Sequence, residues 1–336
     1  MKKAILAVSF GTSYESALRN SIEKLEEDFE KAYPDFEIRR AFTSGTIIRK
    51  LKKRGIIIDT VQEAMHRLED EGFYEVIVQP THLIDGFEYD RLCAAVNKYE
   101  GGIPNLRIGI PLLRTKHDIE RVCELLEKNF DSSYAVAVMG HGTEHNANCT
   151  YEKFGEVCRK KGIKNIFIGT VDARPDINDI IMKLKENGFS RVVLTPLLLV
   201  AGDHANNDMA GDEQDSWKSV LEAEGFEVET VIKGLGEYEE IRALYIEHLR
   251  DTIDNRGYRR QKAIRFLIEK QQKLQRLPQK SDFSIKELGY VKSAFGPLPR
   301  ALEAAGLKEI SPMYLEKQKR RAERRRNAKK RGSENA

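Results

Sequence analysis

An apolar run ends abruptly within the stretch Ala135-Val-Ala-Val-Met-Gly-His141-Gly-Thr-Glu-His145. Its alternating small and branched residues are typical of a buried strand, and the glycines on either side of the histidine allow a sharp turn. The turn places the His141 imidazole at the carboxyl end of that strand. Open α/β sheets bind their ligands at this edge, so His141 is the first candidate site residue.

Strand-like runs alternate with amphipathic segments, such as 14–32 and 117–129, along most of the chain. This alternation, without hairpin turns, predicts parallel sheets with helices on both faces. Eight strands are expected, four in each half. They are predicted at 3–10, 36–42, 74–78, 106–112, 134–139, 165–168, 191–196 and 226–232.

The two halves of this region also resemble each other. Three ordered pairs of similar stretches suggest an internal duplication, with two similar lobes, 1–130 and 131–254, facing a cleft. Chance similarity between apolar strands is the alternative explanation. The pairs are Ala7-Val-Ser-Phe-Gly-Thr12 with Val138-Met-Gly-His-Gly-Thr143, Thr43-Ser-Gly-Thr46 with Phe167-Ile-Gly-Thr170, and Val76-Ile-Val-Gln-Pro80 with Val192-Val-Leu-Thr-Pro196.

This alignment pairs Glu88 of the first lobe with His204 of the second. With His141, the cleft would hold two neutral imidazoles, which suit Co²⁺, Ni²⁺, Fe²⁺ or Zn²⁺, and a carboxylate that can accept protons. Asp172, at a third strand end, could supply an oxygen ligand. His145 could be a third ligand or a group that supports the first two.

Each of these residues also has a simpler interpretation. A single histidine after a strand is more often a hydrogen-bonded turn residue than a ligand, and Glu88 could simply begin a helix, where its charge favours the N-terminal dipole. The symmetric placement of the residues favours a site. The remaining histidines are expected to be structural or on the surface; they are His66, His82, His117 and His248.

Composition excludes several classes of protein. The 336 residues are 40% apolar and 32% charged, which indicates a globular protein. No apolar run has the length of a membrane helix, and the start of the chain lacks a signal-peptide pattern, so a cytoplasmic location is expected. The four cysteines show no CxxC spacing and are expected to be reduced. Walker A, GxGxxG, GxSxG and HExxH motifs are absent, which argues against nucleotide, hydrolase and zincin chemistry.

Residues 2–254 resemble the single-subunit anaerobic cobaltochelatases of cobalamin biosynthesis, which are class II chelatases. The resemblance is carried by long motifs, above all the one that ends in His204 to Met209. The motifs are Val8-Ser-Phe-Gly-Thr-Ser-Tyr14, Arg40-Ala-Phe-Thr-Ser44, Ile47-Ile-Arg-Lys-Leu51, Met139-Gly-His-Gly142, Pro196-Leu-Leu-Leu-Val-Ala-Gly-Asp-His-Ala-Asn-Asn-Asp-Met209 and Asp215-Ser-Trp-Lys218.

The resemblance implies two flavodoxin-like lobes and ATP-independent insertion of Co²⁺ into sirohydrochlorin, with no cofactor beyond the substrate metal. By position, His141 and His204 resemble the family's metal-binding and catalytic histidines, and Glu88 resembles its acidic site residue. Asp172 stands where family members often carry glutamate, and its side chain is one methylene shorter.

The residues themselves leave the metal and the substrate contacts open. Two imidazoles and a carboxylate do not distinguish Co²⁺ from Fe²⁺ or Ni²⁺, and the oligomeric state cannot be read from the sequence. Sirohydrochlorin carries eight carboxylates, so basic groups are expected along the pocket. Four arginines and lysines near predicted strand ends are candidates, although each could be ordinary surface charge; they are Arg49, Lys50, Arg114 and Arg174.

The chain changes character after residue 254. Residues 255–312 are expected to form a small helical module that resembles the homing-endonuclease-associated repeat, chiefly through Phe295-Gly296 and Ala301-Leu-Glu-Ala-Ala-Gly-Leu307. Residues 313–336 are expected to form a basic, disordered tail, and 317–331 alone carries a net charge of +9. Such a segment could bind nucleic acid through counterion release. The alternative function is therefore a nucleic-acid-associated protein that senses a metal or tetrapyrrole, in which Glu88 would be dispensable.

Overall fold

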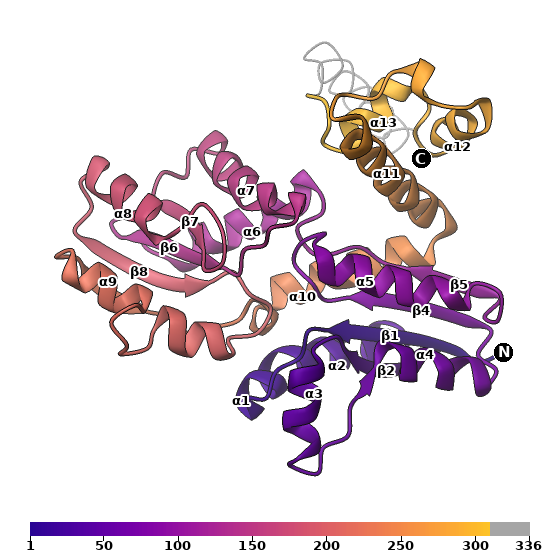
Figure 1. Ribbon diagram of the computed structural model, residues 1–336, viewed down its shortest axis with the longest axis horizontal. Helices are drawn as coiled ribbons and strands as arrows, with labels where there is room; N and C mark the ends of the chain where they lie inside the picture. Colours follow the sequence, from indigo (N-terminus) through magenta and orange to yellow (C-terminus); the bar gives the residue numbers. More distant parts are fainter. Residues whose placement is uncertain (310–336) are drawn as a thin grey trace, which may run out of the picture. The chain divides into compact units, whose positions relative to one another are not determined.

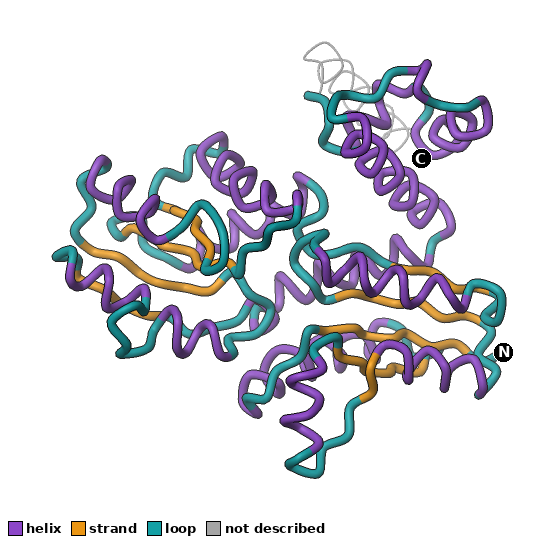
Figure 2. Tube along the Cα trace, in the orientation of Figure 1, coloured by secondary structure: helices purple, strands orange, loops and turns teal. Residues whose placement is uncertain are grey.

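The computed structural model describes residues 1–309, apart from the side chains of residues 255–258, and it divides into two compact units. The first unit is Met1–Tyr258, and the second begins at Arg259. The predicted tail, 313–336, and the last residues of the predicted module lie outside the described residues. Figure 1 labels the helices and strands, and Figure 2 shows the strands of the first unit gathered into two separate sheets among the helices.

The first lobe is built on a parallel sheet with the strand order β3-β2-β1-β4-β5. A π-helical segment, Leu18–Glu23, interrupts the first helical region. The strands are β1 (Lys3–Ser9), β2 (Glu37–Phe42), β3 (Asp59–Thr60), β4 (Glu75–Pro80) and β5 (Asn105–Ile108); the helices are α1 (Glu15–Ala17), α2 (Lys24–Ala32), α3 (Gly45–Lys52), α4 (Val61–Asp70), α5 (Phe87–Val96) and α6 (Lys116–Asn129).

The second lobe has a parallel sheet with the order β7-β6-β8-β9. A second π-helical segment, Ala205–Met209, follows its strand β8. The strands are β6 (Ala135–Gly140), β7 (Ile166–Thr170), β8 (Arg191–Pro196) and β9 (Glu227–Thr230); the helices are α7 (Cys149–Lys160), α8 (Ile177–Glu186), α9 (Trp217–Ala223) and α10 (Glu239–Ile253).

The strand orders support the predicted duplication. Without β3, the first sheet reads β2-β1-β4-β5, which corresponds strand for strand to β7-β6-β8-β9. The three matched pairs of stretches lie on or at the ends of β1 and β6, β2 and β7, and β4 and β8. The α/β fold with parallel sheets is therefore confirmed, and equivalent strand ends of both lobes carry the candidate site residues.

The prediction of four strands in the first lobe was wrong, because β3 adds a fifth. This strand consists of Asp59 and Thr60, which pair with Ala41 and Phe42 at the end of β2. Two residues are too few to produce an alternating or apolar run, so no pattern in the sequence marks them. Thr60 also begins α4, where its hydroxyl accepts a hydrogen bond from the backbone N–H of Glu63 in a capping box.

One hydrophobic core joins the two lobes, and each sheet has a further core on its other face. The shared core includes Ile5 of β1, Val136 of β6 and the last long helix of the unit, α10. Tyr245 of α10 is fully buried, and its hydroxyl donates a hydrogen bond to the carbonyl oxygen of Thr81 after β4, at 2.7 Å. Helix α10, which follows the second lobe in the chain, thus packs against the first lobe. This contact holds the strand ends of both lobes in place.

The second unit has a small core of its own. It contains most of α11 (Asn255–Leu274), α12 (Ile285–Phe295) and α13 (Leu298–Ala304). Ser284 and Glu287 form a capping box at the start of α12. The buried core residues are Leu267, Phe283, Val291, Leu298, Ala301 and Leu302. Among the residues that the structure describes, no helix is both long and apolar enough to cross a membrane.

Candidate metal centre

His141 follows directly on β6, a strand whose six residues are all buried. The glycines on either side of it are required by their surroundings. A Cβ atom on Gly140 would lie 2.3 Å from the ring of Tyr151, and Gly142 has a φ of +87° with the backbone nitrogen of Ala173 packed against it. The tight packing explains why glycines stand on both sides of the histidine where the strand ends. The His141 side chain itself is 46% exposed.

The His141 ring is oriented through its Nδ1 atom. This atom lies 3.0 Å from the carbonyl oxygen of Gly142 and 3.3 Å from Oδ2 of Asp172. A carbonyl oxygen can only accept a hydrogen bond, so Nδ1 carries the proton and donates it. The neutral ring therefore has its free lone pair on Nε2, the arrangement that metal-binding histidines usually show.

His204 is oriented in the same way by a different partner. It immediately precedes the π-helical segment Ala205–Met209, and its Nδ1 lies 2.6 Å from Oδ2 of Asp208, four residues along the chain. The carboxylate accepts the Nδ1 proton, which again leaves the lone pair on Nε2. π-helical turns are rare and occur frequently at functional sites. The Asp208 contact was not predicted, although the spacing of four residues from His204 could have indicated it.

The two imidazoles lie next to each other. Their ring centroids are 4.6 Å apart, and the ring planes are nearly perpendicular at 81°. Within residues 1–309, no hydrogen bond or ion pair engages the Nε2 atom of either ring. The sequence predicted that both histidines lie in one cleft, and in the structure their rings are in contact.

Asp172 lies at the edge of this pair, on the loop after β7. Its backbone N–H donates to the carbonyl oxygen of His141 at 2.9 Å, and its carboxylate contacts the His141 ring as described above. Within the described part of the chain, no group of three or more His, Cys, Asp or Glu side chains is arranged to hold a metal ion. The protein presents two imidazoles, with the carboxylate of Asp172 beside His141 and that of Asp208 beside His204.

Glu88 lies in the first turn of α5, in the other lobe. Its side chain is 34% exposed, and its carboxylate accepts a hydrogen bond from Arg91 at 2.8 Å. The structure brings the start of α5 to the histidine loop through Asp90, whose Oδ2 lies 3.3 Å from Nε2 of His145. The first turn of α5, which carries Glu88, therefore lies near this loop.

His145 has both ring nitrogens engaged. Its Nδ1 accepts a hydrogen bond from the backbone N–H of Ala147 at 3.1 Å, so the proton is on Nε2, which faces Asp90. Its ring also packs edge-on against Phe87, with 4.9 Å between the centroids. Of the two roles considered for His145, this geometry favours the supporting one, because the residue ties the second lobe to the start of α5.

His82 is the histidine whose environment the sequence did not reveal. Both of its ring nitrogens are buried, with no hydrogen-bond partner among residues 1–309. Burial lowers the pKa of His82 to about 4, and the negative charge of Glu88 partly opposes this shift. His82 is therefore neutral at physiological pH and lies close enough to Glu88 to interact with it.

The other predicted residues separate into buried and exposed groups. His66 and His117 are exposed, and His248 is buried with its Nε2 3.1 Å from Oδ1 of Asp118. Among the basic candidates, the Arg114 side chain is only 7% exposed and pairs with Asp85, whereas the Arg174 side chain is 80% exposed. Arg49 bonds to Thr46 on its own helix, and Lys50 lines a pocket.

The fold and the paired histidines define a two-lobed α/β protein of the chelatase type. The structure of SirB from Bacillus subtilis with Fe³⁺ has a similar fold, with a TM-score of 0.53 over 76% of this chain and 97% of that one, at 15% identity. The sequence profile of the cobalt chelatase (CbiK) family matches residues 3–254. The chain therefore belongs to the cobalt chelatase (CbiK) family.

Two relatives match nearly their whole length. The chain is 38% identical over 258 residues to the sirohydrochlorin cobaltochelatase of Salmonella typhimurium, which covers 76% of this chain and 97% of that protein. It is 35% identical over 257 residues to the sirohydrochlorin cobaltochelatase CbiKC of Nitratidesulfovibrio vulgaris, with 74% and 89% coverage. The family match ends at residue 254, so the resemblance of the C-terminal module to a homing-endonuclease-associated repeat stays a prediction.

Proposed function

We propose that this protein is a sirohydrochlorin cobaltochelatase, which inserts Co²⁺ into sirohydrochlorin without ATP. The observation that carries the proposal is the pair His141 and His204, whose Nδ1 atoms both contact acceptors while neither Nε2 atom has a partner within residues 1–309. Two relatives that carry the name sirohydrochlorin cobaltochelatase, at 38% and 35% identity, support the substrate and the metal.

A site with two imidazoles suits a metal ion that the protein must transfer to the macrocycle. Structural metal sites surround the ion with four protein ligands, and such a closed site would retain it. Two imidazoles, assisted by the Asp172 carboxylate, would hold Co²⁺ on one side and leave its other side open to the four nitrogens of the macrocycle. As the ring nitrogens bind, they replace the protein ligands, and the metal passes from the protein to the product.

Glu88 is the proposed proton acceptor. Two pyrrolic protons must leave the free macrocycle when a divalent metal enters, and a carboxylate near the metal can take them. Glu88 comes from the lobe opposite the histidines, so a ring bound in the cleft would have the metal ligands on one side and the base on the other. A cleft that favours the bent ring over the planar one would expose the nitrogens and lower the barrier.

The test is anaerobic incubation of the purified protein with sirohydrochlorin and Co²⁺, followed by the absorption change on metallation. We expect His141→Ala and His204→Ala each to lower the rate by at least about 100-fold, since each removes a metal ligand. His66→Ala is the matched control, because His66 is exposed and pairs only with Asp70 within the described residues. Insertion by both site variants at the rate of the control would contradict the proposal.

Glu88→Ala separates an enzyme from a sensor of metal or tetrapyrrole. An enzyme that uses Glu88 as the base should bind Co²⁺ and sirohydrochlorin but insert the metal slowly. A sensor would keep both binding functions and show no turnover in the parent protein either. Repeating the assay with Fe²⁺ and Ni²⁺ decides whether cobalt is preferred, since the ligand set alone does not discriminate among these ions.

The C-terminal predictions remain separate from this proposal. Contact with nucleic acid was expected from the module and from the basic tail, of which only the module up to residue 309 is described. The family match ends at residue 254 and gives this prediction no support. The expected cytoplasmic location also stays a prediction.

A further inference from the structure

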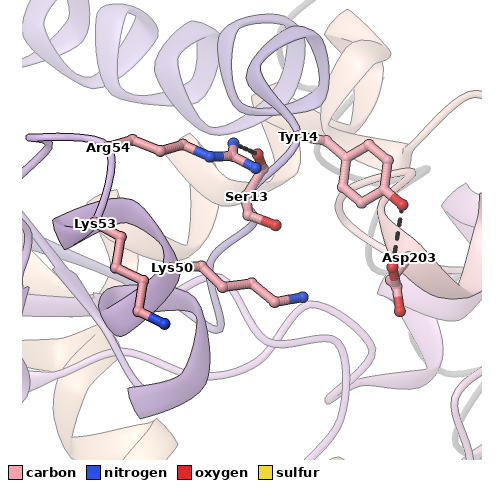
Figure 3. A pocket seen from close by; sticks show the side chains of 6 residues that line it. All are labelled: Ser13, Tyr14, Lys50, Lys53, Arg54 and Asp203. Atoms are coloured by element: carbon pink, nitrogen blue, oxygen red, sulfur yellow. Dashed lines mark hydrogen bonds between the residues drawn. The ribbon is translucent and has the colours of Figure 1, made fainter.

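A pocket of about 430 Å³ adjoins the candidate metal centre, and its lining is strongly basic (Figure 3). Three of its six lining residues are cations from α3 and the turn that follows it, and only one is acidic. That acidic residue, Asp203, immediately precedes His204 in the chain, so the backbone that carries one pocket residue also carries a histidine of the candidate site. The lining residues are Ser13, Tyr14, Lys50, Lys53, Arg54 and Asp203.

The two lysines are not committed to other partners. No ion pair or hydrogen bond within residues 1–309 engages the ammonium group of Lys50 or Lys53, and both residues are exposed. Figure 3 shows both side chains extended from the same helical segment, with Lys50 reaching toward the space between Ser13 and Asp203. Two unpaired ammonium groups at the edge of a cleft attract anions.

Arg54 and Tyr14, by contrast, form hydrogen bonds within the protein and so shape the pocket. The Arg54 guanidinium donates a hydrogen bond to the carbonyl oxygen of Ser13 at 2.6 Å, which fixes the loop after β1. The Tyr14 hydroxyl donates to Oδ1 of Asp203 in the second lobe at 3.0 Å, and Asp203 also accepts from Asn207. These contacts hold the Asp203 carboxylate in place, and within the described residues no ion pair joins it to Lys50 or Lys53.

We propose that Lys50 and Lys53 bind peripheral carboxylates of the tetrapyrrole and select macrocycles that carry many acid groups. This inference rests on the proposed function. Sirohydrochlorin carries eight carboxylates around its rim. If the centre of the ring lies at the two histidines, we expect its edge to reach this pocket, because Asp203 of the pocket is next to His204 in the chain. The pocket is near the lower end of the roughly 300–1,000 Å³ range of small-molecule sites, a size that suits the acid arms at one edge of the ring.

The test measures binding and turnover separately. Metal-free sirohydrochlorin is titrated into the purified full-length protein, followed by its absorption, and cobalt insertion is then assayed. Lys50→Ala and Lys53→Ala should each raise the dissociation constant and KM about 3- to 10-fold and leave kcat within about twofold. The double variant should also lose part of the preference for sirohydrochlorin over a porphyrin with two carboxylates. Lys50→Arg, which keeps the charge, should restore binding.

Lys52→Ala is the matched control. Lys52 is an exposed lysine on the same helix, but it does not line the pocket, and its charge acts on Glu63 instead. If Lys50→Ala and Lys53→Ala bind sirohydrochlorin as tightly as Lys52→Ala in an active protein, the inference is wrong and the proposed function stands. If the parent protein neither binds sirohydrochlorin nor inserts cobalt, the proposed function fails and the inference fails with it.

Discussion

Each histidine of the candidate metal centre has an acceptor at Nδ1 that sets its tautomer. For His204 this acceptor is the Asp208 carboxylate, at 2.6 Å from Nδ1. Without it, the neutral ring could carry its proton on Nε2, the atom that must be free to bind the metal. His141 has a backbone carbonyl in the same role, and no side-chain substitution can remove that group.

Asp208→Asn should therefore weaken Co²⁺ binding and cobalt insertion by about 10- to 100-fold, the usual effect of removing an outer partner of a ligating histidine. The amide can present its NH₂ group to Nδ1 and favour the wrong tautomer. Cobalt titration by absorption and the metallation rate measure the two effects. Asp212→Asn is the control, because Asp212 is 96% exposed and pairs with Lys218. Equal behaviour of the two variants would show that Asp208 does not orient His204.

His82 gives the protein a pH-dependent stability. Its pKa is about 4 in the folded protein, and an unfolded histidine has a pKa of about 6.5. Between these values the unfolded chain binds a proton that the folded protein does not. The free energy of unfolding should therefore decrease as the pH falls from about 6.5 toward 4, with about 2 kcal/mol lost between pH 7 and pH 5 from this group.

Urea unfolding at pH 7 and pH 5 tests this prediction. The His82→Leu variant should lose the contribution, so its free energy of unfolding should fall less between the two pH values than that of the parent protein. His66→Gln should behave like the parent, because His66 is exposed. If His82→Leu and the parent protein show the same pH dependence of the free energy of unfolding, then a group other than His82 causes it.

At the scale of elements, the junction between β6 and its loop combines an unusual backbone angle with close packing. Gly142 and Gly162 have nearly the same φ, +87° and +85°. A Cβ on Gly142 would lie 2.8 Å from the backbone nitrogen of Ala173, whereas nothing lies within 4 Å of one on Gly162. Comparing an alanine substitution at each of the two positions therefore separates the effect of backbone strain from that of crowding.

Gly162→Ala should cost about 1–2 kcal/mol of unfolding free energy, the strain of a left-handed alanine. Gly142→Ala should cost more, because the loop that carries Ala173 and Asp172 must also move away from His141. Urea unfolding measures the stability, and the metallation assay measures the site. Only Gly142→Ala should slow cobalt insertion, and equal losses of stability with unchanged insertion would show that this loop is not held by packing.

The sequence predicted the long elements but not the short or irregular ones. The buried run of β6 and the matched stretches of the two halves indicated the parallel sheets correctly, because long apolar runs leave a periodic pattern. β3 has only two residues, and the two π-helical segments have the composition of ordinary helices. Tertiary contacts determine these features, so the hydrophobic periodicity of the sequence does not reveal them.

At the scale of the whole molecule, the first unit contains everything that the proposed reaction uses. The family match ends within it, and its three hydrophobic cores all lie within residues 1–258. The candidate site depends on this unit because its residues come from both lobes. The duplication alone predicted that Glu88 faces His204, and this stays a prediction. The contacts of Asp90 with His145 and of Tyr14 with Asp203 join distant segments and could not be predicted.

A protein truncated after residue 258 should insert cobalt at a rate within about twofold of the full-length protein. The second unit has its own core and contributes no residue to the candidate site. Parallel metallation assays test this. The two proteins should also be titrated with duplex DNA at low and high salt, because electrostatic binding weakens steeply as salt increases. If full-length protein binds no better than the truncated one, the predicted nucleic-acid contact is wrong.

The tethered Nδ1 protons have a consequence for the proton balance of the whole reaction. Under the proposed function, Co²⁺ binds at Nε2, which carries no proton in the neutral tautomer that these acceptors select, so binding to that tautomer displaces no hydrogen ion from the rings. The hydrogen ions released during turnover then originate in the macrocycle, at two per metal inserted. Glu88 must pass on the protons that it accepts before the next cycle, whereas the two rings need no reprotonation.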